Sequence, residues 1–105
     1  MSIKELDPVI VWKNFYELTQ IPRPSKHEEM AVEYMYNWGV SHGLETIKDE
    51  IGNIVIRKPA TPGCENMKGV ILQGHIDMVP QKNADTVHDF EKDPIQTWID
   101  GEWVK

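Results

Sequence analysis

The spacing of apolar residues changes at Gly43, and this change limits the folds that the chain can adopt. Before it, Ala31, Tyr34, Met35 and Trp38 recur at intervals of three and four residues, which places them on one face of a helix. Gly43 fits the position just after that helix, because glycine readily takes the left-handed conformation that ends many helices. After Gly43 the apolar runs are short and strand-like. The pattern predicts an α/β or α+β class, with helices first and strands afterwards.

A first helix is expected to precede the one that ends at Gly43. Asp7 suits its N-cap and Pro8 its first helical position. Apolar residues follow at helical spacing as far as Leu18, and Pro22 stops the helix because the residue before a proline avoids helical geometry. The second helix is predicted to start at residues 25–28, where Ser-Lys-His-Glu matches a capping box.

The strands are predicted from alternation, continuous apolar runs and turn residues. They cover residues 44–48, 53–57, 70–73, 95–99 and 102–104. Residues 49–52 form the turn between the first two strands. Residues 70–73 are the strongest candidate for a buried strand, because their apolar run is nearly continuous. Asp100-Gly101 is typical of a type I′ hairpin turn, and residues 79–94 are polar and irregular.

Charge and hydropathy narrow the class of protein. The 105 residues suffice for one small domain, and their formal net charge of −6 disfavours a nucleic-acid partner. No apolar stretch approaches the roughly 20 residues of a membrane helix, and the N-terminus lacks the apolar region of a secretory signal. The single cysteine, Cys64, permits no intrachain disulfide. These features predict a cytoplasmic protein without a membrane partner.

A histidine and an aspartate follow the apolar run of residues 70–73. In an extended segment residues two apart point to the same side, so His75 and Asp77 are expected to share a face. A neutral imidazole is a good zinc ligand, and a ligating histidine usually donates its other ring N–H to a carboxylate or carbonyl. His75 is therefore the candidate metal ligand and Asp77 its orienting acid. A hydrogen-bonded surface pair is the alternative interpretation of so short a motif.

Other histidines and acids give weaker signals. One histidine cannot hold a catalytic zinc, which takes about three protein ligands. Solvation or the electrostatics of helix ends explains His27, His42, Glu28 and Glu29. A mononuclear hydrolase site built from His75, Asp77, His88 and Asp89 stays open as an alternative, if the polar loop approaches the motif.

Residues 72–83 resemble the first metal-site motif of the co-catalytic zinc exopeptidases related to aminoacylase and glutamate carboxypeptidase. The pattern there is Gly-His-x-Asp-x-Val-Pro, and residues 74–80 match every fixed position. A narrower resemblance, to the aminoacyl-histidine dipeptidases, is carried by four segments. They are the end of this motif (Met78 and residues 81–83), the earlier residues 21–29, residues 52–63 and the terminal hairpin. The resemblance covers essentially all 105 residues.

The resemblance implies that residues 1–105 are the N-terminal portion of a mixed-sheet α/β catalytic domain, without the lid domain. It implies that His75 binds one of two zinc ions, with cobalt or manganese as alternatives. Asp77 then corresponds to the active-site aspartate that hydrogen-bonds this histidine. The implied substrate is a dipeptide with C-terminal histidine, with broader tolerance open, and the full-length protein is a possible homodimer.

The remaining ligands of such a site are expected after Lys105. The chain therefore reads as an N-terminal fragment of a dinuclear zinc dipeptidase, with negligible activity and weak zinc affinity alone. The alternative is a non-catalytic truncated remnant, or an interaction module that binds a partner through unpaired sheet edges.

Overall fold

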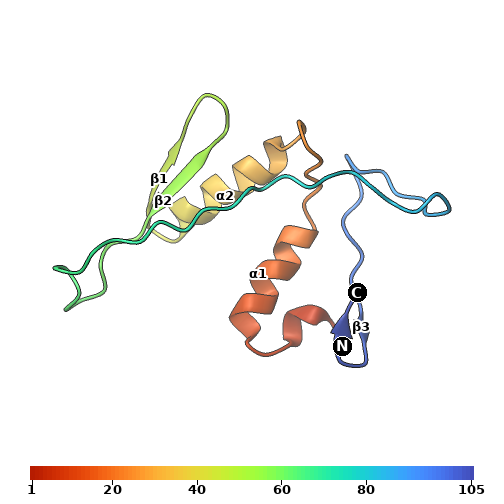
Figure 1. Ribbon diagram of the computed structural model, residues 1–105, viewed down its shortest axis with the longest axis horizontal. Helices are drawn as coiled ribbons and strands as arrows, with labels where there is room; N and C mark the ends of the chain where they lie inside the picture. Colours follow the sequence, from red (N-terminus) through yellow and green to blue (C-terminus); the bar gives the residue numbers. More distant parts are fainter. The chain divides into compact units, whose positions relative to one another are not determined.

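A computed structural model describes residues 1–105 (Figure 1). These residues form two compact units. Unit 1 combines Met1–Ala31 with Asp77–Lys105, and unit 2 is Val32–Ile76. The elements are η1 (Ile3–Glu5), α1 (Val9–Thr19), α2 (Glu29–Ser41), β1 (Glu45–Lys48), β2 (Ile54–Arg57), β3 (Ile99–Asp100) and β4 (Trp103–Val104). The predicted order, two helices followed by strands and a C-terminal hairpin, is confirmed. No helix is long and apolar enough to cross a membrane.

The first long helix, α1, begins one residue later than predicted. Its N-cap is Pro8, in extended conformation, and the Pro8 carbonyl accepts hydrogen bonds from the amides of Val11 and Trp12 at 3.0 and 3.2 Å. Asp7 precedes this cap, so its side chain does not cap the helix and the predicted N-cap is wrong. The Asp7 carbonyl instead accepts from the Trp12 indole at 3.2 Å. The predicted stop before Pro22 is confirmed, because α1 ends at Thr19.

The predicted capping box at residues 25–28 does not form, and α2 begins at Glu29. The His27 amide donates to the Pro24 carbonyl at 2.9 Å, which closes a turn with Lys26 at φ +75°. Because this left-handed residue interrupts the chain before the helix, residues 26–28 are not a first helical turn. The Glu28 carboxylate accepts from the Lys26 amide at 2.6 Å.

The end of α2 matches the prediction at Gly43. Gly43 has φ +70°, its amide donates to Val40 at 3.0 Å, and the Leu44 amide donates to Gly39 at 3.0 Å. This pair of bonds is the Schellman motif, which satisfies the last helical carbonyls. The His42 ring adds a contact to the Trp38 carbonyl at 2.7 Å and stacks on the indole, as expected for a residue at this helix end.

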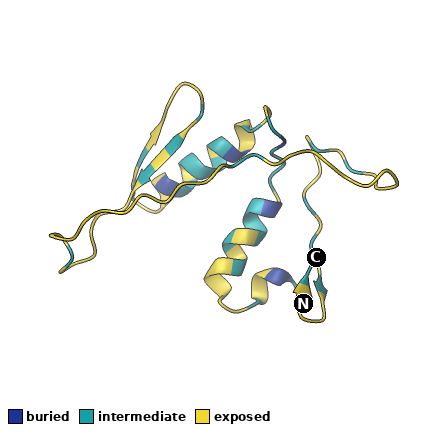
Figure 2. Ribbon diagram, in the orientation of Figure 1, coloured by how far each residue is buried: buried dark blue, intermediate teal, exposed yellow.

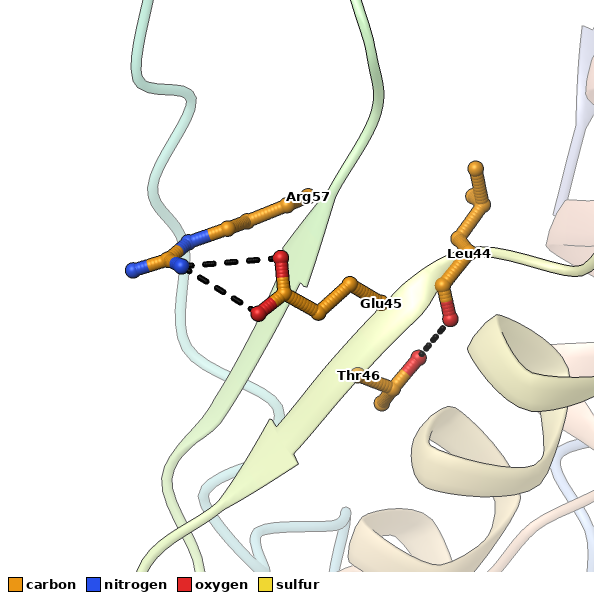
Figure 3. A network of polar contacts seen from close by, with 4 residues as sticks. All are labelled: Leu44, Glu45, Thr46 and Arg57. Carbon is orange, nitrogen blue, oxygen red and sulfur yellow. Dashed lines mark hydrogen bonds and ion pairs between the residues drawn. The ribbon is translucent and has the colours of Figure 1, made fainter.

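Unit 2 is completed by the predicted hairpin of β1 and β2. The strands are antiparallel and pair Glu45 with Arg57, and these side chains also form an ion pair at 3.2 Å (Figure 3). A Cβ on Gly39 would lie 2.2 Å from Thr46 Oγ1 and 3.2 Å from Ile56 Cδ1. Only glycine therefore permits α2 to approach this hairpin so closely.

Residues 70–73 contradict the prediction of a buried strand. They belong to no strand, and Val70, Ile71 and Leu72 are 82%, 93% and 92% exposed. The segment that follows β2 is accordingly coloured as exposed along most of its course (Figure 2). A continuous apolar run becomes a buried strand only when neighbouring strands pair with it, and none of the strands within residues 1–105 does so.

The C-terminal hairpin is present with a register different from the prediction. Ile99 pairs with Val104 and Asp100 with Trp103, so the loop is Gly101-Glu102 and not Asp100-Gly101. Gly101 has φ +62° and Glu102 does not have a positive φ, whereas a type I′ turn needs positive φ at both positions. The glycine at the first loop position is typical of a type II′ turn.

Candidate functional site

The carboxylate of Asp77 lies against the connector that follows α1. The Ser25 hydroxyl donates a hydrogen bond to Asp77 Oδ2 at 2.5 Å, across 52 positions of sequence. Both residues are half-buried, and both belong to unit 1. An O–H···O⁻ bond of this length is in the range of charge-assisted hydrogen bonds. Asp77, the predicted orienting acid, therefore has Ser25 as a hydrogen-bond partner, although Ser25 was predicted to cap a helix.

The backbone on each side of this contact is also paired. Pro24 and Met78 form an isolated parallel bridge. The Met78 amide donates to Arg23 at 2.9 Å, and the Ser25 amide donates to the Met78 carbonyl at 3.1 Å. Pro24 has no N–H, but the two bonds use the amides of Met78 and Ser25, so the proline removes no hydrogen bond from the bridge. Asp77 is therefore held next to Ser25 by main chain as well as by side chain.

Arg23 ties this connector to the end of α1. Its Nη1 donates to the carbonyls of Leu18 and, at 3.2 Å, Ile21. These carbonyls stand at and just beyond the last turn of the helix, where acceptors lack helical partners. Burial lowers the pKa of Arg23 from its ordinary value. An arginine nevertheless keeps its charge at neutral pH, so these bonds persist under physiological conditions.

A cavity of about 630 Å³ adjoins the same segments of unit 1. Its lining comes from residues 21–24, residues 78–82 and part of residues 86–98. Most of the lining side chains are apolar, and Lys82, His88 and Asp93 add polar groups. Such hollows, apolar with a few polar groups, are typical of sites for small ligands. Asp77 is not itself part of the lining, although its neighbour Met78 is.

A second, more open hollow of about 650 Å³ brings the polar loop next to the connector. Its lining includes Ser25, His27, His88, Asp89 and Glu91. His27 Nε2 lies 3.4 Å from Glu91 Oε1, with both side chains about 60% exposed, in agreement with the expected solvation of His27. The His88 ring packs edge-on against Phe90, with centroids 5.0 Å apart.

The structure does not assemble a complete metal site. No group of three or more His, Cys, Asp or Glu side chains is placed to hold a metal ion. His75, Asp77, His88 and Asp89 consequently do not form the mononuclear site that the sequence left open. His75 is exposed in unit 2, and Asp77 is the first residue of the second segment of unit 1. The expectation that His75 and Asp77 share a face stays a prediction.

Sequence reasoning missed Ser25 and Arg23 as supports of Asp77. Ser25 was predicted to be part of a capping box, and no role was predicted for Arg23. The one available signal was the segment of residues 21–29, which entered the resemblance without a role for either residue. A contact across 52 positions leaves no periodic trace in a single sequence.

Over nearly all of its length the chain shares sequence and fold with dipeptidases. It superposes on the crystal structure of aminoacylhistidine dipeptidase from Vibrio alginolyticus with a TM-score of 0.93 and 55% identity, covering 99% of this chain and 21% of that one. It is 56% identical over 104 residues to the cytosol non-specific dipeptidase of Escherichia coli (strain K12), covering 99% of this chain and 21% of that protein. No family model matches.

These similarities confirm the predicted resemblance to aminoacyl-histidine dipeptidases. The chain spans about a fifth of the length of both relatives. The mixed α/β order of two helices and antiparallel strand pairs agrees with the solved structure that it matches.

Proposed function

We propose that this chain is part of the catalytic domain of a metal-dependent dipeptidase. The observation that carries the proposal is identity of more than half of the residues, over 99% of the chain, to two dipeptidases. His75 is the metal ligand that the chain contributes, and Asp77 is the acid that orients it. We propose that the remaining ligands come from outside these 105 residues, in which no group of three or more His, Cys, Asp or Glu side chains is placed to hold a metal ion.

The donors present fit a metal such as zinc. The His75 side chain is exposed and carries an imidazole, a preferred zinc ligand, and Asp77 is a carboxylate already held by a hydroxyl. When bound, two ions of zinc, cobalt or manganese would polarise the substrate carbonyl and lower the pKa of a bound water. In the proposed site, Asp77 would accept the second ring N–H of His75, which would fix the tautomer and raise the basicity of the ligating nitrogen.

The proposed substrate is a dipeptide with C-terminal histidine. The names of the two relatives differ on this point, because one is called an aminoacylhistidine dipeptidase and the other a non-specific dipeptidase. Activity on other dipeptides at a lower rate is part of the proposal. The cytosol in the name of the Escherichia coli relative supports a cytoplasmic location, and a homodimer is proposed for the complete protein.

The test uses the complete gene product, meaning the polypeptide encoded by the open reading frame that contains these codons. It is assayed for release of histidine from an Xaa-His dipeptide and for hydrolysis of a histidine-free dipeptide, and its metal content is measured. We expect turnover with about two metal ions per chain, and negligible turnover by the 105-residue chain alone. An inactive, metal-replenished gene product would contradict the proposal, as would robust turnover by the 105 residues.

One observation favours a second candidate, a non-catalytic module that binds a partner. The apolar run Val70, Ile71 and Leu72 is almost fully exposed and unpaired, and such segments add strands to other chains. A stop codon directly after codon 105 supports this candidate. A continuing frame with further Asp, Glu and His motifs supports the dipeptidase.

A further inference from the structure

We propose that Ser25 is a positioning residue of the dipeptidase site, acting through Asp77. The inference rests on the proposed function, because it assigns to Ser25 the task of fixing the acid that orients the metal-ligating His75. Ser25 itself touches neither metal nor substrate in this account.

The hydrogen-bond geometry selects Asp77 as the target of the hydroxyl. Ser25 Oγ lies 2.5 Å from Asp77 Oδ2 and 3.4 Å from the Met78 carbonyl oxygen. A hydroxyl has one proton to donate, and the shorter bond to a carboxylate is the stronger one. Oδ2 of Asp77 is therefore fixed by Ser25, and the orientation of the carboxylate plane is limited with it.

The backbone holds the serine ready for this contact. The Ser25 amide donates to Met78, the Met78 amide donates to Arg23, and the two strands of chain form a parallel bridge. On the C-terminal side of Ser25, Lys26 at φ +75° closes the turn that ends at His27. A non-glycine residue in this conformation carries strain, and such strain is found at sites where the chain must present a group in one direction.

The consequence for catalysis follows from the role of Asp77. A carboxylate that orients a ligating histidine is useful only when its own direction is fixed, and loss of such an outer partner costs about 10- to 100-fold in metal affinity or activity. Without the Ser25 hydroxyl, Asp77 gains rotational freedom, and the site loses preorganisation and not substrate contacts. We therefore expect kcat and metal affinity to fall while KM changes little.

The experiment compares two variants of equal shape in the complete gene product. Ser25→Thr keeps a hydroxyl, and Ser25→Val replaces it with a methyl group. We expect Ser25→Val to lower kcat and zinc affinity about tenfold each, with KM within about twofold, and Ser25→Thr to stay within about threefold of wild type. Ser41→Val, which removes the hydroxyl that bonds the Trp38 carbonyl in α2, is the matched control and should leave kcat and zinc affinity unchanged.

Zinc affinity is measured by competition with a chelator, and thermal unfolding verifies that each variant is folded. If Ser25→Val does not fold, Ser25→Gly takes its place because it adds no bulk. Wild-type kcat and zinc affinity in the valine or glycine variant would overturn the inference, as would equal losses in the threonine and valine variants. An inactive wild-type gene product instead sinks the proposed function, so the two failures are distinguishable.

Discussion

Arg23 shows how a single side chain secures the connector on which the candidate site depends. Its guanidinium serves the carbonyls of Leu18 and Ile21, while its own carbonyl accepts the Met78 amide. A planar group with several donors can serve two acceptors at once, whereas the ammonium of lysine is a point charge on a flexible stem. The side chain and main chain of one residue thus connect the end of α1 to the motif that contains Asp77.

Replacing Arg23 with alanine should loosen that connection. The change leaves two partly buried carbonyls without their charged donor, and we expect the free energy of unfolding to fall by about 1–3 kcal/mol. The amides of Ser25 and Met78 should exchange hydrogen faster, which NMR or mass spectrometry can measure. Lys13→Ala, an exposed change on α1, is the control. Unchanged exchange at Ser25 and Met78 in Arg23→Ala would show that the arginine does not support the bridge.

At the scale of elements, the turn between β1 and β2 depends on one carboxylate. Asp49 Oδ1 accepts from the amides of Ile51, Gly52 and Asn53 at 2.9, 2.9 and 2.8 Å. Oδ2 accepts from the Asn53 side chain at 2.7 Å. The Asn53 side chain, followed by the backbone amides, holds the pKa of Asp49 below its ordinary value of 3.8.

The lowered pKa predicts how this turn responds to acid. A carboxyl whose pKa is depressed in the folded state stabilises that state at pH values above its unfolded pKa, and this contribution is lost as the pH falls through the folded pKa. The amide proton shifts of Ile51, Gly52 and Asn53 should therefore be constant from neutral pH down to about 5 and move together below about 4. NMR titration measures this.

Two variants give the controls for the titration. Asp49→Ala should abolish the coupled movement and loosen the β1–β2 hairpin even at neutral pH. Glu50→Ala, a change at the adjacent exposed acid that makes none of these bonds, should preserve it. A coupled movement that survives in Asp49→Ala would mean that another group controls the turn.

Local patterns predicted the elements well where local chemistry decides. The helix end at Gly43 and the hairpin around residues 49–52 depend on neighbours within a few positions, and both are confirmed. The hairpin at Gly101 was predicted with the wrong register, because Asp-Gly and Gly-Glu loops differ by one residue and the sequence permits either. The role of Ser25 was missed because a capping pattern explained it locally while its partner lies 52 positions away.

At the scale of the whole molecule, the chain covers few of its apolar side chains. Ile3 and Ala31 are the buried hydrophobic residues, and the run that precedes the His-x-Asp motif is exposed. Burial of residues 70–73 was predicted from their nearly continuous apolar run, but it depends on partner strands that none of the 105 residues supplies. The relatives are about five times as long, and we expect the complete gene product to cover this run with strands from elsewhere.

In the candidate site too, the features marked by a local pattern were predicted, whereas the contacts with distant residues were not. His75 and Asp77 were predicted from their spacing after an apolar run, and the dipeptidase class was implied by the resemblance of several segments to a known family. The sequence did not predict the partners of Asp77, and the remaining metal ligands cannot be inferred from residues that do not contain them.

The proposed role of His75 as a metal ligand of a dipeptidase is tested by His75→Ala in the complete gene product. Metal content is measured together with kcat/KM on an Xaa-His dipeptide, and His42→Ala, at the end of α2, is the control. We predict that His75→Ala loses about one of two bound metal ions and at least ~100-fold in kcat/KM, while His42→Ala keeps both. Full metal content and activity in His75→Ala would contradict the account.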